Sequence, residues 1–129
     1  VTFRVLITGS RTWEDAAVVY DALHAFLVSS GVSRNSVVIV HGGAKGVDSI
    51  AGHYAHELDI NQEIHEISPA SWSEHGNRAG FLRNEKMVNL GADVCLAFQR
   101  DKSKGTQITI DLARAAGIPT YVYTEEESD

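Results

Sequence analysis

The stretch VIVHGGAKGVDSIAG, residues 38–52, joins a run of β-branched residues to a helical pattern through a loop with three glycines. The run that ends at residue 41 is typical of a buried strand. From residue 47 onward, apolar residues recur with helical spacing. A strand that passes directly into a helix is the unit from which parallel α/β sheets are built.

The same alternation extends over the whole chain. We expect strands at 3–8, 36–41, 62–67, 93–98 and 119–124, helices at 14–30, 47–58, 78–90 and 106–116, and polar loops at 68–77 and 99–105. Strict alternation predicts a parallel sheet with right-handed crossovers and helices on both faces. The expected fold class is therefore α/β, a three-layer α/β/α Rossmann-like sandwich around a five-stranded parallel sheet. It would form one domain over residues 1–124, followed by an acidic tail at 125–129.

Size and composition narrow the class of protein. The chain has 129 residues, which suits one domain, and its net charge of −6 disfavours attraction to nucleic acid or to an anionic membrane. No apolar stretch approaches the roughly 20 residues of a membrane span, and the first ten residues follow a strand pattern, not that of a signal peptide. Cys95 is the single cysteine and lies in a strand pattern, so we expect it in the core. These features predict a cytoplasmic protein without a membrane partner.

Small, polar and basic residues gather where strands pass into helices. They are Gly9, Ser10 and Arg11 after the first strand, Gly42, Gly43, Lys45 and Gly46 after the second, and Ser103, Lys104, Gly105 and Thr106 after the fourth. Carboxyl ends of parallel strands meet at one edge of the sheet, where α/β proteins bind their ligands. We therefore expect these residues to line one ligand-binding rim.

The residue types at this rim suit phosphate. A helix N-terminus offers unpaired N–H groups and partial positive charge, and glycine lets an anion approach the backbone. We interpret Gly42, Gly43 and Gly46 as a phosphate cradle with Lys45 as its point charge, and residues 103–106 as a second cradle. No metal ligand set and no resident cofactor is expected, since the histidines lack an H-E-x-x-H pattern and a cysteine partner.

Several of these residues also have ordinary structural roles. Asp48 either caps the helix that begins near residue 47 or binds a ribose hydroxyl, and Thr106 either caps its helix or contacts the ligand. Residues 9–11 form either a tight turn or part of the site. The pair Arg83–Asn84 is either a solvated surface pair or part of the site. The loops match neither G-x-G-x-x-G nor the G-K-[ST] ending of a P-loop, so the usual dinucleotide and ATPase motifs are absent.

Five segments together resemble the YspA-like branch of the SLOG superfamily, which is named for the Smf/DprA and LOG proteins. They are GSRTW (9–13), HGGAKGVDSIA (41–51), AGFLRNEKMV (79–88), GADVCLAF (91–98) and SKGTQITIDLARAAGIP (103–119). The resemblance covers about residues 4–122. It implies a Rossmann-like fold that binds nucleotides or nucleotide-derived ligands at the glycine-rich rim, in proteins often found in conflicts between phage and bacteria.

The resemblance also implies a candidate reaction. The LOG branch cleaves the N-glycosidic bond of nucleoside monophosphates with an arginine, which corresponds to Arg83, and a glutamate just after the glycine-rich loop. Here Ile108 and Thr109 stand where that glutamate would be. Because a carboxylate stabilises the oxocarbenium-like transition state, Asp48 or Glu85 would have to replace it. The catalytic candidates are therefore Arg83, Asp48 and Glu85.

Three functions follow, in order of preference. The first is a sensor or sequestering protein for a nucleotide-derived phosphate ligand, the second is a LOG-like nucleotide hydrolase, and the third is single-stranded nucleic-acid binding as in the DprA branch. Whether the chain is an enzyme is left open, since the usual glutamate is absent. The resemblance further implies a homodimer. Apolar residues of the helix at 78–90 could serve its interface, although core packing explains them equally well: Phe81, Leu82, Met87 and Val88.

Overall fold

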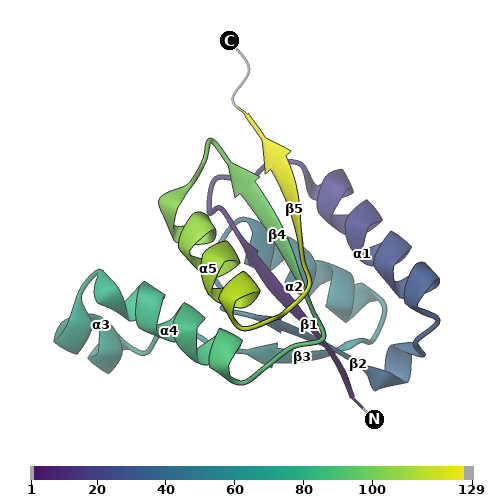
Figure 1. The fold of residues 1–129 in the computed structure, drawn as a ribbon, viewed down its shortest axis with the longest axis horizontal. Coiled ribbons are helices and arrows are strands. Elements are labelled where there is room, and N and C mark those ends of the chain that lie inside the picture. Colours follow the sequence, from purple (N-terminus) through teal and green to yellow (C-terminus); the bar gives the residue numbers. More distant parts are fainter. Residues whose placement is uncertain (1, 127–129) are drawn as a thin grey trace.

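The computed structural model describes residues 2–126 and contains one parallel sheet of five strands (Figure 1). The strands are β1 (Phe3–Gly9), β2 (Val37–His41), β3 (Asn61–Ile64), β4 (Val94–Arg100) and β5 (Thr120–Glu125), in the spatial order β3-β2-β1-β4-β5. The helices are α1 (Ala16–Ser30), α2 (Val47–Glu57), α3 (Pro69–His75), α4 (Arg78–Asn89) and α5 (Lys104–Ala115), with a short 3-10 turn at Arg34–Ser36. The predicted α/β Rossmann-like sandwich is confirmed.

Side chains of the central strands alternate between two cores, because successive residues of a strand face opposite sides of the sheet. On one face, Val5 and Ile7 pack with residues of α1 and α2. On the other face, Leu6 packs with Met87 of α4 and with Ala113 of α5. Both faces of β1 are thus covered, which explains why its middle reads as a continuous apolar run.

Two residues of the predicted dimer face belong to this second core. Met87 and Val88 are almost fully buried beside Cys95, itself buried as the sequence predicted. Met87 and Val88 therefore pack α4 against the core. The homodimer itself stays a prediction.

The segment 68–77, expected to be a polar loop, forms the short helix α3. Ser68 begins it, with a hydroxyl that accepts the Ser71 N–H at 3.1 Å, and Pro69 occupies the first helical position. Its main contacts are with α4, and in Figure 1 it stands away from the sheet at the left. The loop prediction was wrong because a serine–proline pair can start a helix as well as a turn.

The boundaries at both edges of the sheet also differ from expectation. The strand predicted at 62–67 ends at Ile64, and β4 runs to Arg100, so only residues 101–103 separate it from α5. Glu125, assigned to the acidic tail, belongs to β5, and its carboxylate accepts the N–H groups of Glu14 and Asp15 at 3.1 and 3.0 Å. Glu126 of the predicted tail is exposed, and residues 127–129 lie outside the described residues.

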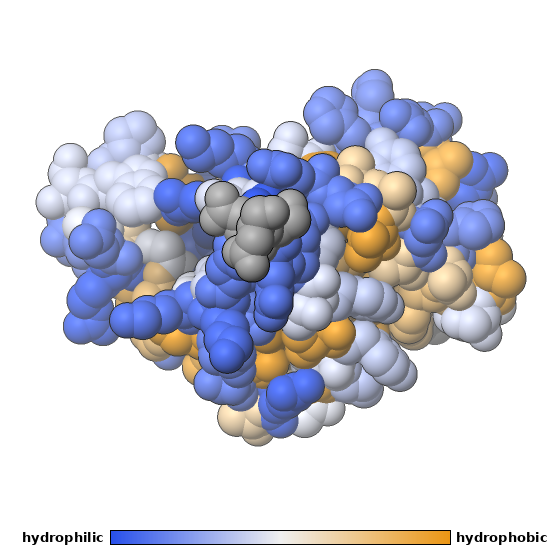
Figure 2. Space-filling model, turned by 90° about the horizontal axis from the view of Figure 1, so that it is seen from above, coloured by the Kyte–Doolittle hydropathy of each residue, from blue (hydrophilic) through white to orange (hydrophobic). Residues whose placement is uncertain are grey.

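The rim at the carboxyl ends of the strands faces the viewer in Figure 2. Hydrophilic residues dominate the middle of this view, and the surface is hollowed between them and the lobe at the left, where Figure 1 places α3. Within residues 2–126, no helix combines the length and the apolar character needed to cross a bilayer.

Candidate functional site

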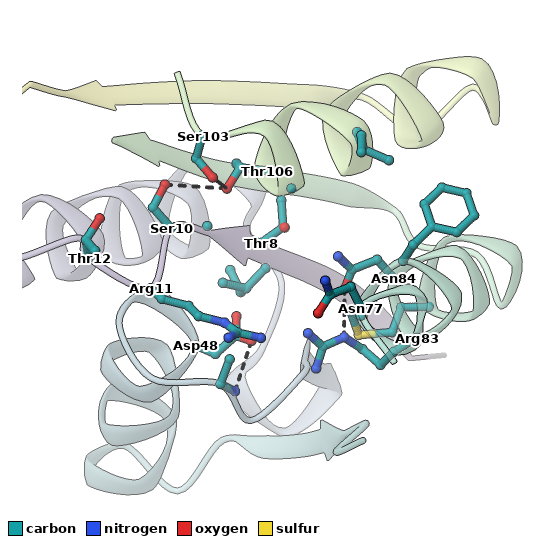
Figure 3. A pocket seen from close by; sticks show the side chains of 18 residues that line it. Thr8, Ser10, Arg11, Thr12, Asp48, Asn77, Arg83, Asn84, Ser103 and Thr106 are labelled. Atoms are coloured by element: carbon teal, nitrogen blue, oxygen red, sulfur yellow. Dashed lines mark hydrogen bonds between the residues drawn. The ribbon is translucent and has the colours of Figure 1, made fainter. Parts of the chain in front are cut away.

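The main cavity lies where the strand order reverses, between β1 and β4. The chain runs from β1 outward to β2 and β3, and then returns across the sheet to β4. Side chains from β1, α2, α4 and α5 surround a cavity of about 430 Å³ at this place (Figure 3). It unites predicted site residues that are far apart in the sequence: Gly9, Ser10, Arg11, Asp48, Arg83, Asn84, Ser103, Gly105 and Thr106.

A second cavity of about 330 Å³ adjoins the first. Gly42, Gly43 and Lys45 line it, together with residues that follow β3. Arg11 and Arg83 line both cavities. The predicted rim is therefore divided in two.

Gly46, Lys104 and Glu85 line neither cavity. Glu85 is thereby set apart from Asp48 as a candidate catalytic carboxylate. Asp111, the acid nearest to the position of the missing glutamate, is exposed and accepts a bond from Gln107 at 3.0 Å.

Three backbone N–H groups of the glycine-rich loop after β2 are bonded within the protein. The N–H groups of Gly42 and Ala44 donate to Asp48 Oδ2 at 3.1 and 3.3 Å, and the Gly43 N–H donates to His41 Nδ1 at 3.0 Å. These are three of the N–H groups that a phosphate cradle in this loop would use. Asp48 was expected either to cap α2 or to bind a ribose hydroxyl. Its contacts within the protein are instead with the N–H groups of the preceding loop.

Two glycines of this loop make room for other parts of the protein. A Cβ at Gly42 would overlap the guanidinium of Arg83, whose Nη1 donates to the Gly42 carbonyl at 2.7 Å. Gly46 has a φ of 82°, and a Cβ there would lie 2.7 Å from backbone atoms of Arg11. Packing therefore explains these glycines. The prediction that they bind phosphate is not needed to account for them.

Asp48 is almost fully buried and lines the main cavity. Burial raises the pKa of its carboxyl group, and the charges of His41 and Arg83 and the two N–H bonds oppose that shift. Asp48 therefore brings to the cavity a carboxyl group that takes up a proton more readily than an exposed aspartate would.

Three hydroxyl groups meet at the wall of the main cavity. The Oγ of Ser10 accepts the Arg100 N–H at 2.8 Å and lies 3.5 Å from Thr106 Oγ1, which in turn donates to Ser103 Oγ at 3.3 Å. Ser10 and Thr106 are almost fully buried. The two contacts that involve Thr106 are long for O–H···O hydrogen bonds, so these hydroxyls can turn toward a stronger acceptor at little cost.

The same wall contains the N-terminus of α5. Ser103 occupies the N-cap position, but its side chain makes no capping bond. Among residues 2–126, the N–H groups of Lys104, Gly105 and Thr106 have no acceptor. A free first turn of a twelve-residue helix thus opens at the cavity beside three hydroxyls.

Two arginines lie on the opposite wall. Arg83 donates only to neutral oxygens, those of Gly42, His65 (3.3 Å) and Asn84 (2.7 Å). Arg11 is exposed and forms no ion pair within the described part of the chain, and Figure 3 shows it reaching toward Arg83. Burial lowers the pKa of the Arg83 guanidinium, the charge of Arg11 adds to this, and Asp48 opposes it. The wall therefore carries positive charge without a bonded carboxylate.

Some lining residues were not predicted. Thr8, Asn77 and Phe81 contribute a hydroxyl, an amide and a ring to the main cavity. Asn77 is the N-cap residue of α4 and forms no capping bond, and an asparagine before a helical pattern was a usable signal. No sequence signal marked Phe81 as a site residue, because an aromatic residue in an amphipathic helix normally faces the core.

The two tryptophans that flank the rim have different places. Trp13 is 4% exposed and packs edge-on against Phe98, with ring centroids 5.6 Å apart. Trp72, on α3, is 41% exposed and lines the second cavity. Of the two indoles, only that of Trp72 is therefore open to a ligand.

Comparison with known proteins identifies relatives over most of the chain. The model of the YspA, cpYpsA-related SLOG family matches residues 3–75, more than half of the sequence. The Gene 61 protein of Mycobacterium phage D29 is 48% identical over 120 residues, which are 90% of this chain and 92% of that protein.

A solved structure shares the fold. DNA processing protein A (DprA) from Streptococcus pneumoniae superposes with a TM-score of 0.74 over 94% of this chain, at 19% identity. The chain spans half of the length of DprA. At this identity the likeness concerns the fold alone, the three-layer arrangement of helices around a parallel sheet.

Proposed function

The chain belongs to the YspA, cpYpsA-related SLOG family, and on this premise we propose that its main cavity binds a nucleotide or nucleotide-derived ligand through a phosphate at the N-terminus of α5. One observation carries the proposal. The free first turn of α5 and the hydroxyls of Ser10, Ser103 and Thr106 converge in a cavity at the switch point of the sheet. The role that follows is that of a sensor or a sequestering protein.

Phosphate suits this wall chemically. Its oxygens accept hydrogen bonds from backbone N–H groups, and its negative charge is favoured by the positive end of the helix. The hydroxyl protons, now in contacts of 3.3 and 3.5 Å, can be redirected to the phosphate oxygens. Phosphate would therefore receive bonds from groups that have no strong partner in the free protein.

The remaining lining suits the nucleoside. A volume of about 430 Å³ lies within the usual range for small-molecule sites. Phe81 offers an apolar ring surface, and the amides of Asn77 and Asn84 offer both donors and acceptors to the polar edge of a base. Which base is preferred depends on these two amides.

The test is calorimetric titration with AMP, GMP and ribose 5-phosphate, with adenosine as the ligand that lacks phosphate. AMP should bind at least 10-fold more tightly than adenosine, because the phosphate contacts are charge-assisted. Thr106→Val, which removes a hydroxyl at nearly constant volume, should weaken AMP binding roughly 10-fold. Arg114→Ala, which removes an exposed charge in the last turn of α5, serves as the control and should bind AMP normally.

Two results would contradict the proposal. One is adenosine binding as tightly as AMP. The other is the absence of any binding or thermal shift with the phosphorylated ligands at millimolar concentration, while a single-stranded oligonucleotide binds with a strong dependence on salt.

The position of Asp48 favours a second candidate, hydrolysis of the N-glycosidic bond. Its buried carboxylate lines the cavity, and Arg83 lies close enough to influence its pKa. A carboxylate there would stabilise the positive charge that develops on the ribose as the bond to the base breaks. Water would then supply the new hydroxyl, giving free base and ribose 5-phosphate.

Chromatography of AMP incubated with the protein tests this second candidate. If the reaction occurs, Asp48→Asn should abolish release of adenine while AMP still binds. Glu85→Gln should keep the activity, because Glu85 lines neither cavity. The reverse pattern would contradict the assignment to Asp48, and intact AMP in all samples would leave binding as the function.

A further inference from the structure

The two edge strands of the sheet differ in how well they are protected from pairing with another chain. β3 has four residues, three of them polar or charged, whereas β5 has six residues and lies beside β4 at the other edge (Figure 1). Short length and charge are common devices that keep an edge strand unpaired. The segment TYVYT (120–124) contains no charge and no proline, and Tyr121 and Val122 are 54% and 36% exposed. β5 is therefore the edge that is open to another strand.

The ladder between β4 and β5 shows which backbone groups of β5 are free. The carbonyl group of Pro119 accepts the Cys95 N–H at 2.8 Å. At the other end of β5, the carbonyl group of Glu125 accepts the Asp101 N–H at 3.0 Å. Odd-numbered residues of this segment therefore face β4, and even-numbered residues face away, because the direction alternates along a strand. Within residues 2–126 no strand lies beside the outward-facing residues, which are Thr120, Val122 and Thr124.

These outward residues can pair with the same residues of a second copy. If two β5 strands run antiparallel about an axis through Val122, each Val122 lies opposite the other. Thr120 then lies opposite Thr124 of the second copy, and each of these outward pairs exchanges two hydrogen bonds. On the other face of the sheet, Tyr121 lies opposite Tyr123 of the second copy, and such aromatic cross-strand pairs are stabilising. The segment is thus complementary to itself.

The acidic residues at the end of β5 do not oppose this arrangement. Glu125 lies opposite Pro119 of the second copy in the register centred on Val122. Glu126 lies opposite Ile118, so no acidic side chain faces another. No residue of β5 lines the main or the second cavity, so the pairing leaves both of them open.

We propose that two copies of this chain associate through β5, whose antiparallel pairing about Val122 joins the two sheets into one continuous sheet. The axis pairs valine with valine, tyrosine with tyrosine and threonine with threonine, which favours a second copy over an unrelated strand. This surface differs from the face of α4 that the sequence suggested, of which Met87 and Val88 belong to the core. The inference is independent of the proposed function, because it involves neither cavity.

Sedimentation equilibrium over a range of protein concentrations tests the association. Wild type should change from monomer to dimer in the micromolar range, because pairing of one strand buries less surface than an obligate interface. Val122→Lys places two like charges opposite each other and should raise the dissociation constant of the dimer at least 10-fold. Val28→Lys is the matched control, since Val28 is a valine of α1 with 67% exposure, and it should dimerise as wild type does.

A second variant removes only a backbone donor. The N–H of Val122 points away from β4, and proline, which lacks this group, is tolerated in edge strands. Val122→Pro should therefore keep the ladder with β4 but weaken the dimer at least 10-fold. Circular dichroism and thermal melting check that both variants at this position are folded.

Cysteine cross-linking reports the register. Val122→Cys places two thiols on residues whose Cα atoms lie about 5.5 Å apart, within the range of a disulfide, and mild oxidation should give a covalent dimer. Thr124→Cys should remain uncross-linked, because the two copies of residue 124 lie roughly 13 Å apart along the strand. The native Cys95 is buried and should form no cross-link.

Hydrogen exchange gives an independent reading on the unmodified protein. The N–H of Val122 faces outward and should exchange rapidly in the monomer, whereas that of Tyr123 faces β4. Raising the protein concentration should slow the exchange of the Val122 N–H and leave that of Tyr123 unchanged.

Three results would overturn the inference. The first is a monomer at millimolar concentration. The second is a dimer that persists in both Val122→Lys and Val122→Pro, since another surface would then hold it together. The third is cross-linking of Thr124→Cys without cross-linking of Val122→Cys. Val122→Lys should bind AMP as wild type does, so a failure of AMP to bind bears on the proposed function alone.

Discussion

The loop after β2 and the loop after β4 contain similar residue types but differ in how many of their N–H groups are bonded within the protein. In residues 42–46, the N–H groups of Gly42, Gly43 and Ala44 are bonded to Asp48 and His41. At 103–106, the first turn of α5 has no capping bond and opens at the main cavity. In the loop with more glycines, three of the N–H groups that could bind an anion are therefore already bonded to side chains of the protein.

The comparison shows that glycine has two uses at a strand-to-helix junction. It can let a ligand approach the backbone, or it can let two parts of the protein approach each other. Gly42 and Gly46 serve the second use, because a guanidinium and a neighbouring loop occupy the space of their missing side chains. The phosphate proposal therefore rests on free N–H groups and not on glycine content.

The largest difference in stability should come from replacing one glycine of each loop by alanine. Gly46→Ala should destabilise the protein by about 3 kcal/mol, because it combines an unfavourable positive φ with overlap against the loop after β1. Gly105→Ala should be neutral or stabilising by up to about 1 kcal/mol, because nothing lies within 4 Å of its added Cβ and alanine favours a helix. Urea unfolding measures both, and equal costs would contradict the comparison.

A smaller effect should follow from removing one polar group in each loop. Asp48→Ala leaves the N–H groups of Gly42 and Ala44 without their acceptor, at a cost of about 2 kcal/mol. Ser103→Ala should cost less than about 0.5 kcal/mol, well below the usual loss of an N-cap, because its side chain makes no capping bond. A cost near 1 kcal/mol for Ser103→Ala would show that α5 is capped in solution.

The raised pKa of Asp48 should be visible in the pH dependence of stability. Because its folded pKa is raised above 3.8, the folded state takes up a proton more readily than the unfolded chain. The contribution of Asp48 to stability therefore rises as pH falls from 7 toward 4, and Asp48→Asn should lose this rise. Unfolding curves of both proteins between pH 4 and pH 7 provide the measurement, and parallel curves would contradict the raised pKa.

Glu63, on β3, should behave in the opposite way. Its bonds to Arg4 and His65 hold the pKa of its carboxyl group at about 2. The stabilisation by the ionised Glu63 is complete above pH 4.5 and is lost as pH falls toward 2. The difference in the free energy of unfolding between wild type and Glu63→Gln should therefore become smaller over that range. Urea unfolding of wild type and Glu63→Gln at pH 3 and pH 6 measures this difference, and an equal difference at both pH values would contradict the lowered pKa of Glu63.

The smallest effect on stability should come from Arg11→Ala. Arg11 is exposed and has no ion pair among the described residues, so the free energy of unfolding should change by less than about 0.5 kcal/mol. Binding of phosphorylated ligands should nevertheless weaken, since Arg11 lines both cavities. Loss of stability without loss of affinity would show that its role is structural.

The fold could be predicted almost completely, because its evidence is local. Apolar and β-branched runs, one period-two segment and helical spacing predicted all five strands and four of the five helices. The error was α3, whose start at Ser68 and Pro69 resembles a turn.

The site was predicted less well than the fold. The sequence selected Ser10, Arg83 and Thr106, which do line the main cavity, but it missed Thr8 and Phe81.

What the sequence determined by itself is the α/β order, the family, and the edge of the sheet at which polar residues gather. The α/β order and the edge depend on periodicity and on the rule that carboxyl ends of parallel strands share one edge, whereas the family depends on five motifs in their order along the chain. Only the tertiary structure decided which N–H groups are free, that Asp48 closes the loop after β2, and that Arg11 and Arg83 join two cavities. The physical reason is that hydrogen-bond satisfaction depends on partners distant in the chain. The capacity of a loop to bind a ligand is what remains after those partners are in place.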